Sequence, residues 1–414
     1  MISRRGFLQN SAVVSLGLAI PGIFSKAVGV AAEEKADKSM SGKTLVVIQM
    51  AGGVDGLNTV IPYTDPVYRD LRRGVGIPEN EMLVVDDRIA FHPSFGRMRE
   101  LFQSGNVAVI EGVGYPDPSY SHFKAMDIWQ TADPRGTAED GWLGRYFDEA
   151  VDVEGHPLAG LNVGRSLPSA FESPRVSLPS VESLETFSLA PARGDPDPMR
   201  RQETLMRLYD IYRPANTPFA ALLDTTLDNA FKSSTELTEA HAAYQPAVEY
   251  PQSSMASGLR LLAELIDSGG AAGSPLRVGH VTIGGFDTHT QQPARFAQLL
   301  QQANDAIYAF WQDISSHGHA DDVLVMTWSE FGRRVAENAQ MGTDHGSAGP
   351  MFIVGKAIKG GFHGAPPSLS SLDDGNLRFT TDFRSVYATL IEGWLQSPSD
   401  QILGGRFDKL TFLA

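Results

Sequence analysis

Six runs of apolar residues recur along the chain, each bounded by glycine or by polar residues. The runs are rich in Leu, Val and Ile with few polar interruptions, a pattern typical of strands buried on both faces of a parallel sheet. The sequence therefore predicts strands at 43–50, 106–114, 158–164, 277–285, 321–330 and 349–355.

Two segments between and after these runs repeat apolar residues at helical spacing. Residues 293–315 place Phe296, Leu300, Ile307 and other apolar side chains on one helical face, and residues 382–395 follow the same pattern. Such a stripe is typical of packing against a core. Strands that alternate with helices predict a layered α/β/α fold with a mostly parallel sheet.

One region interrupts this alternation. Residues 165–198 are rich in Pro and Ser, and residues 200–268 read as helices without strands. We expect 165–268 to form a mainly helical insertion that covers one face of the sheet. The insertion would belong to a single α/β domain that spans 43–414.

The N-terminus has the order of features found in an export signal. A motif at 3–8, SRRGFL, precedes an apolar stretch at 11–24 that is too short to span a bilayer comfortably. The motif resembles the twin-arginine signal. We expect a signal peptide at 1–32, carried by the twin-arginine translocase, and a flexible leader at 33–42. The mature protein would be periplasmic or otherwise exported, without a stable membrane anchor, although an uncleaved anchor is the alternative.

Composition narrows the classes of function. The formal net charge is −15 over 414 residues, which argues against a nucleic-acid partner because phosphate backbones attract Lys and Arg. The chain has no cysteine, so disulfides, thiolate metal ligands and a cysteine nucleophile are excluded. It also lacks a Walker loop and a G-x-G-x-x-G motif, so we expect no nucleotide cofactor.

Polar side chains gather at the ends of the predicted strands, where α/β proteins place their chemistry. They are Asp55 after the first run, Ser119, Ser121 and His122 after the second, Asp287 and His289 after the fourth, Glu330, Arg333 and Arg334 after the fifth, and Asp344 and His345 before the last. Carboxylates and imidazoles are the ligands of Zn²⁺ or Mn²⁺ where thiolates are absent. This pattern predicts a metal site.

Several of these residues also have structural interpretations. Asp344 fits an Asx turn. Ser121 fits a helix N-cap, with His122 as an ordinary polar residue. Arg333 and Arg334 would hold an anionic substrate, but a surface salt bridge is an equal alternative for at least one of them.

Taken together, the motifs resemble the exported DUF1501 family. The matching segments are GGVDGLNTVIP, SHFKAMDIWQT, GWLGRYFD, GGFDTHTQQ, SEFGRR and TDHGSAGPMFIVG, which extend over nearly the whole chain. That family is similar in layout to the alkaline phosphatase and sulfatase superfamily. The resemblance implies an alkaline phosphatase-like fold with a two-metal site.

The resemblance also implies roles for single residues. These are Asp55 as the first-strand metal ligand, Ser121 as the nucleophile, and Asp287, His289 and His345 as further ligands. Two features depart from the superfamily pattern. Glu330-Phe331 stands where Asp-His is usual, which removes one imidazole from a second metal site, and the arginine that follows a sulfatase nucleophile is absent.

The sequence thus predicts an exported metal-dependent hydrolase of phosphate or sulfate esters. Ser121 or a water molecule would attack a small anionic ester whose charge Arg333 holds. A Zn²⁺ or Mn²⁺ ion would be bound by Asp55, Asp287, His289, Glu330, Asp344 and His345. This hypothesis requires the ring nitrogens of His289 and His345 to lie within roughly 3 to 4 Å of each other.

The alternative is a non-catalytic exported protein that binds an anion or a partner in the same pocket. A metal shell without a reactive hydroxyl nearby would favour binding, and a hydroxyl within hydrogen-bond distance would favour catalysis.

Overall fold

The computed structural model of the protein describes residues 42–151, 153, 156–183, 207, 232–272 and 275–414. The predicted signal peptide at 1–32 lies outside the described residues, as does nearly all of the leader. Of the predicted insertion, residues 184–206 and 208–231 also lie outside them.

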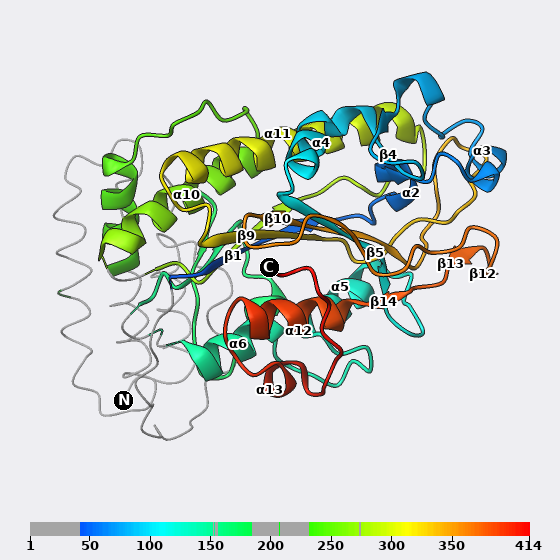
Figure 1. Ribbon diagram of the computed structural model, residues 1–414. Coiled ribbons are helices and arrows are strands. Elements are labelled where there is room, and N and C mark those ends of the chain that lie inside the picture. Colours follow the sequence, from blue (N-terminus) through cyan, green and yellow to red (C-terminus); the bar gives the residue numbers. More distant parts are fainter. Residues whose placement is uncertain (1–41, 152, 154–155, 184–206, 208–231, 273–274) are drawn as a thin grey trace.

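A mixed, mostly parallel sheet forms the centre of the molecule (Figure 1). Its strands are β1 (Thr44–Met50), β5 (Val107–Gly114), β6 (Gly160–Val163), β7 (Ser180–Val181), β8 (Val278–Ile283), β9 (Val323–Trp328), β10 (Gly349–Gly355), β11 (Gly361–His363) and β14 (Thr381–Asp382). The order is β11-β5-β10-β9-β1-β8-β6-β7, and β14 pairs with β5. All six predicted strands are present.

The strand directions confirm the prediction of a mostly parallel sheet, with one exception. β1 pairs in parallel with β8 and with β9. β10 is antiparallel to both of its neighbours, β9 and β5. Because β10 separates β9 from β5 and opposes both, β5 runs in the same direction as β9.

Helices cover both faces of the sheet (Figure 1). One face carries α4 (Gly96–Gln103), α10 (Ser254–Ala272) and α11 (Gln292–Ser316), and the other carries α5 (His122–Thr131), α6 (Trp142–Ala150), α12 (Phe383–Gly393) and α13 (Ser399–Leu403). Strand β1 is buried along its whole length. Val46 and Ile48 point into the core beneath α10 and α11, and Leu45 and Val47 point into the opposite core. Two buried faces explain why the run has so few polar residues.

The two helices predicted from periodicity correspond to α11 and α12, within two residues at each end. Helix α10 begins in the predicted insertion and ends four residues beyond it, and its Leu259 and Leu262 join the same core as α11. Among the described residues, no helix is long and apolar enough to cross a membrane.

The remaining described elements are short. They are α2 (Gly56–Thr59), α3 (Pro66–Leu71), a three-stranded sheet of β2 (Val60–Ile61), β4 (Ala90–Phe91) and β3 (Leu83–Val84), the pair β12 (Leu372–Asp373) and β13 (Asn376–Leu377), and the 3₁₀ turns η1 (Glu79–Glu81), η2 (Pro93–Phe95) and η3 (Ser169–Phe171).

Candidate metal centre

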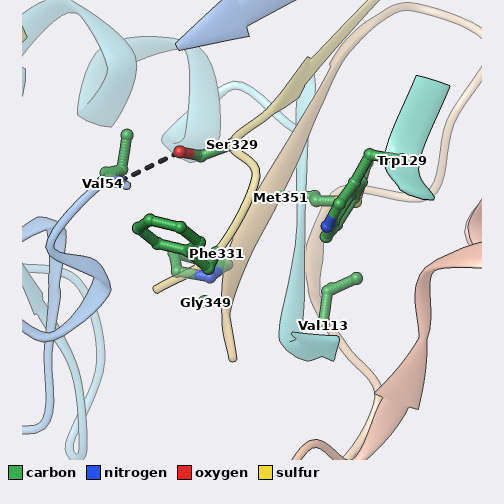
Figure 2. A pocket seen from close by; sticks show the side chains of 8 residues that line it. Val54, Val113, Trp129, Ser329, Phe331, Gly349 and Met351 are labelled. Carbon is green, nitrogen blue, oxygen red and sulfur yellow. Dashed lines mark hydrogen bonds between the residues drawn. The ribbon is translucent and has the colours of Figure 1, made fainter. Parts of the chain in front are cut away.

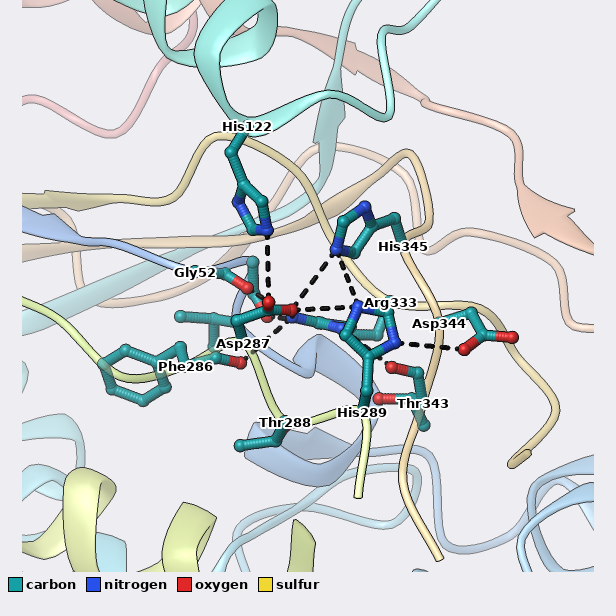
Figure 3. Close-up of polar contacts among 12 residues, drawn as sticks. Gly52, His122, Phe286, Asp287, Thr288, His289, Arg333, Thr343, Asp344 and His345 are labelled. Atoms are coloured by element: carbon teal, nitrogen blue, oxygen red, sulfur yellow. Dashed lines mark hydrogen bonds and ion pairs between the residues drawn. The ribbon is translucent and has the colours of Figure 1, made fainter. Parts of the chain in front are cut away.

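One edge of the sheet collects loops from distant parts of the sequence. Strands β1, β5, β8 and β9 run in the same direction, so the loops that follow them meet at their carboxyl ends. Because β10 runs the other way, the loop that precedes it reaches the same edge. These loops bring together His122, Asp287, His289, Arg333 and His345 (Figure 3).

Three histidines converge on Asp287 (Figure 3). Asp287 Oδ1 lies 3.0 Å from His289 Nε2 and 3.2 Å from His345 Nε2. Asp287 Oδ2 lies 3.5 Å from His122 Nε2. The Nε2 atoms of His289 and His345 are 2.9 Å apart, so they meet the distance that the metal hypothesis requires.

The other ring nitrogen of each histidine, Nδ1, faces a hydrogen-bond acceptor. The acceptors are Glu330 Oε1 for His122 at 2.7 Å, Asp344 Oδ1 for His289 at 3.1 Å and the Tyr120 carbonyl oxygen for His345 at 2.7 Å. A neutral imidazole that donates from Nδ1 keeps a lone pair on Nε2. All three lone pairs therefore point toward Asp287. Acceptors of this kind orient metal-bound histidines in many proteins.

The donor atoms fit a divalent cation. Four ligands at about 2.0 to 2.1 Å in a tetrahedron have donor atoms roughly 3.3 Å apart. His122, Asp287 and His345 have ligand atoms that all lie within 4.8 Å of one another, and His289 Nε2 lies 2.9 Å from His345 Nε2 and 3.0 Å from Asp287 Oδ1. His122 Nε2 is buried without a hydrogen-bond partner, and an ion would satisfy it. Three carboxylates and the guanidinium of Arg333 leave two formal negative charges here, which a divalent ion would balance.

Arg333 holds Asp287 in place. Its side chain is fully buried, and Nη2 donates to Asp287 Oδ1 at 2.7 Å. Burial raises the pKa of Asp287, but the hydrogen bond and charge of Arg333 outweigh it and lower the pKa to about 2. The remaining donors of Arg333 bind the carbonyl oxygens of Gly52, Gly53, Phe286 and Thr343. The full burial of the side chain and these contacts do not favour the predicted role of Arg333 as a substrate clamp.

Glu330 lies behind His122. The carboxylate is fully buried and accepts from the Gly52 N–H, at 2.8 and 3.1 Å. Gly52 has a φ of +123°, and a Cβ there would lie 2.3 Å from the Asp287 nitrogen, so only glycine permits this approach. Glu330 contacts the His122 nitrogen that points away from Asp287. It orients a ligand and is not placed as the direct ligand that the sequence predicted.

Asp344 also acts through a histidine. It accepts from His289 Nδ1 and, at 3.0 Å, from Asn338 Nδ2. The hydrogen bond from Asn338 lowers the pKa of Asp344, and that from His289 adds to the effect. Of the two roles open to it, ligand or partner of a ligand, the contacts match the second. Gly346 lets this loop pack against the backbone of Arg333, since a Cβ there would lie 2.4 Å from the Arg333 carbonyl carbon.

Asp55 forms a buried ion pair with an arginine. Its carboxylate is fully buried and accepts from Arg72 Nη1 at 2.8 and 2.6 Å and from Gln292 Nε2 at 2.5 Å. The Arg72 side chain is itself fully buried. A guanidinium therefore neutralises the carboxylate that follows the first strand. These contacts do not favour the predicted role of Asp55 as a metal ligand.

Ser121 is the N-cap residue of α5, and its side chain makes no capping hydrogen bond. Among the described residues, its hydroxyl makes no hydrogen bond to the histidine cluster. The next residue, His122, reaches Asp287 instead. Sequence reasoning placed His122 among the polar residues at strand ends but did not name it as a ligand. The incomplete set of imidazoles elsewhere in the sequence was the one signal that could have identified it.

A small apolar pocket lies next to the cluster (Figure 2). Its lining includes Phe331, Trp129 and Met351, and no ionisable side chain lines it. The Phe331 ring also packs against the rings of His122 and His345, with centroids 4.9 and 4.5 Å apart. Phe331 therefore packs its apolar ring against both histidine rings. The polar side chains that could bind a metal lie with the histidines and not in the pocket.

The fold and the site define an α/β protein with a candidate metal centre of three histidines and one aspartate at the carboxyl edge of its sheet. The chain belongs to the family described as "Protein of unknown function (DUF1501)", whose sequence model matches residues 42–384. The predicted membership is thereby confirmed. No curated protein matches the chain significantly.

Several solved structures are similar to this chain. The C-terminal periplasmic domain of EcEptC from Escherichia coli, in complex with Zn, is 10% identical, with 78% of this chain and 75% of that chain covered and a TM-score of 0.35. A protein in the alkaline phosphatase superfamily from Vibrio parahaemolyticus is 9% identical, with 77% and 62% covered and a TM-score of 0.36. The PsFucS1 sulfatase from Pseudoalteromonas sp. is 12% identical, with 90% and 73% covered and a TM-score of 0.34. Similarity at this level assigns no function and no site residue.

Proposed function

We propose that this protein is an exported, metal-dependent hydrolase of phosphate or sulfate esters. The observation that carries the proposal is the convergence of three histidine Nε2 atoms on Asp287, with an acceptor at every Nδ1. A bound divalent cation would polarise the ester and lower the pKa of water. The resemblance of the sequence motifs to the alkaline phosphatase and sulfatase superfamily supports the ester class.

In this proposal each residue of the centre has its own role. Asp287 supplies the ligand charge, and Arg333 keeps it ionised and oriented. Glu330 and Asp344 accept Nδ1 protons, so the Nε2 lone pairs of their histidines stay available. Nitrogen and carboxylate donors suit Zn²⁺ or Mn²⁺. Because the Ser121 hydroxyl lacks a contact to the cluster, we assign the attack to water.

A second candidate is a non-catalytic protein that binds an anion or a partner at the same centre. One observation favours it. No serine or threonine hydroxyl of the described residues is hydrogen-bonded to any of the three histidine rings. The site would then bind phosphate or sulfate through the metal without breaking a bond.

Metal analysis of the purified full chain, followed by an ester panel, tests both candidates. We expect about one Zn²⁺ or Mn²⁺ ion per chain, since Arg72 already neutralises Asp55. Turnover of phosphate monoesters, phosphate diesters or sulfate esters should stop on chelation and return with the metal. Protein that binds no ion would contradict the hydrolase and the binding of an anion through a metal. A loaded protein that binds phosphate or sulfate but turns over no ester would support the second.

A further inference from the structure

The ring of Phe331 contacts two of the three histidines of the candidate centre. Its centroid lies 4.9 Å from that of His122 and 4.5 Å from that of His345, with interplanar angles of 41° and 36°. The two histidine rings also contact each other edge to face, with centroids 4.5 Å apart. The three rings therefore form one packed group, in which Phe331 is the member that has no ligand atom.

The backbone around Phe331 is built to admit its ring. Phe331 is 3% exposed, and a Cβ on Gly53 would lie 2.4 Å from Phe331 Cε2, so the residue beside the ring has to be glycine. Phe331 also follows Glu330 in the sequence, and Glu330 Oε1 lies 2.7 Å from His122 Nδ1. Two consecutive residues after β9 thus hold His122, one at its nitrogen and the other at its ring.

The same Phe331 side chain lines the apolar pocket, whose lining includes neither histidine (Figure 2). The one hydroxyl of this lining, on Ser329, already accepts from the Val54 N–H at 3.0 Å and donates to Glu330 Oε2 at 3.2 Å. Water in this pocket would find few free polar partners. Phe331 therefore separates the two histidines from apolar surroundings and not from solvent-filled space.

The exposure of the four candidate ligands follows their contact with Phe331. The side chains of His122 and His345, which contact the ring, are 25% and 20% exposed. The side chains of His289 and Asp287 are 37% and 44% exposed, and among the described residues no ring contact joins His289 to Phe331. The centre is therefore covered on the Phe331 side and open on the side of His289 and Asp287.

A covered side limits the number of water molecules that a bound ion could keep. The hydrophobic surroundings of a metal site control its access to solvent. Zn²⁺ takes four or five ligands and suits imidazole, whereas Mn²⁺ suits carboxylate, carbonyl and water in octahedral sites. A set of three imidazoles and one carboxylate that is covered on one side therefore suits Zn²⁺ better than Mn²⁺.

We propose that Phe331 is a positioning residue that excludes water from one side of the centre and thereby favours Zn²⁺ over Mn²⁺. This inference rests on the proposed function for the presence of an ion, and it goes further because the proposed function leaves the two ions as alternatives. Phe331 itself binds no ion, so it acts through the two histidines that its ring contacts.

Cobalt absorption and metal competition on the full chain test the proposal without turnover. We expect the Co²⁺-loaded protein to show the intense visible bands of four- or five-coordinate cobalt. In Phe331→Ala these bands should weaken as water enters, and the ratio of the Mn²⁺ and Zn²⁺ dissociation constants should fall roughly tenfold or more. Phe331→Leu keeps a large apolar side chain and should retain both properties. Phe331→Val is the milder truncation if Phe331→Ala does not fold.

Met351→Ala is the matched control. Met351 is 1% exposed and lines the same pocket from strand β10, so its truncation removes core packing but leaves the Phe331 ring in place. This variant should keep the cobalt bands and the ratio of dissociation constants of wild type. A general loss of packing would affect it as much as Phe331→Ala.

The outcomes separate the role of Phe331 from the proposed function. A folded Phe331→Ala or Phe331→Val with unchanged bands and an unchanged ratio would overturn that role and leave the proposed function intact. Six-coordinate cobalt in wild type, or an equal loss of the bands in Met351→Ala, would overturn it as well. Wild type that binds neither Zn²⁺ nor Co²⁺ would instead contradict the proposed function, and this inference with it.

Discussion

The three histidines of the candidate centre are held by groups of different rigidity. His122 faces Glu330, a fully buried carboxylate that the Gly52 N–H fixes from behind. His289 faces Asp344, which is more than half exposed. His122 is therefore held by a more buried acceptor than His289.

Replacing single histidines tests the ligand set. His122→Ala, His289→Ala and His345→Ala should each lower metal affinity by orders of magnitude, because each removes one Nε2 donor from the shell. A double variant of His289 and His345 should retain no less metal than either single one. Metal content after dialysis, measured by atomic spectroscopy, gives the answer.

The control for this series is His363→Ala. His363 Nε2 contacts the Lys359 carbonyl oxygen, on β11 and away from the cluster, so its loss should leave the metal content unchanged. His317 is a poor control because it stacks on Tyr244. Full metal content in all three ligand variants would refute the assigned shell.

A substitution of Ser121 distinguishes a water nucleophile from the Ser121 hydroxyl as nucleophile. Ser121→Ala should retain turnover within a few-fold of wild type. Ser121 is the N-cap residue of α5, and its side chain makes no capping hydrogen bond. Steady-state kinetics on the best ester of the panel provides the measurement. Loss of turnover with full metal content would instead restore Ser121 as the nucleophile.

At the level of elements, a buried polar network joins the loop after β1 to the start of α11. Asp55 bridges Arg72 and Gln292, and the Gln292 side-chain oxygen accepts from the Thr343 hydroxyl at 2.6 Å. Thr343 immediately precedes Asp344. The network therefore holds the metal-site loop of β10 against helix α11, although none of its members faces the histidines.

Removing the charge of Asp55 tests whether this network is structural. Asp55→Asn leaves Arg72 buried without its counter-ion and should lower the free energy of unfolding by about 3 to 5 kcal/mol. Chemical denaturation measures this loss. Lys356→Ala, which removes an exposed ion pair with Asp321, should have little effect. Metal content that falls by half in Asp55→Asn, with stability unchanged, would identify a second ion at Asp55 instead.

At the scale of the whole molecule, folding and export are coupled in the proposed function. Twin-arginine cargo folds before export, so a three-loop metal site would be assembled before the protein leaves the cytoplasm. The double arginine at positions 4 and 5 motivates this expectation.

Changing both arginines to lysine tests the export route. Arg4→Lys combined with Arg5→Lys keeps the charge but removes the motif, so the protein should accumulate in the cytoplasm. Fractionation and immunoblotting compare the variant with wild type. A single exchange of Lys26 for Arg, which leaves the motif intact, is the matched control, and undiminished export of the double variant would rule out the twin-arginine route.

Local sequence was sufficient for six strands of the central sheet, for helices α11 and α12 and for part of the candidate site. Unbroken apolar runs predicted all six principal strands, because β1 and its neighbours are buried on both faces. Polar residues at strand ends pointed to Asp287 and His289, since strand carboxyl ends meet at one edge of a sheet. His345, which precedes its strand, was expected to join them from the family resemblance. Local sequence patterns could not predict which charged side chains pair with each other. The pairing of Asp55 with Arg72 and of Arg333 with Asp287 depends on contacts across the fold.

The sequence by itself determined the α/β class, the strands and the chemical types of the ligands. Tertiary structure alone decided that the ligands meet. His345 precedes its strand, and a residue before a parallel strand lies at the opposite edge from Asp287. It reaches the site because β10 pairs antiparallel with β9 and β5. Strand direction is set by long-range pairing and packing, which local periodicity does not encode, and the same packing turns His122 rather than Ser121 toward the centre.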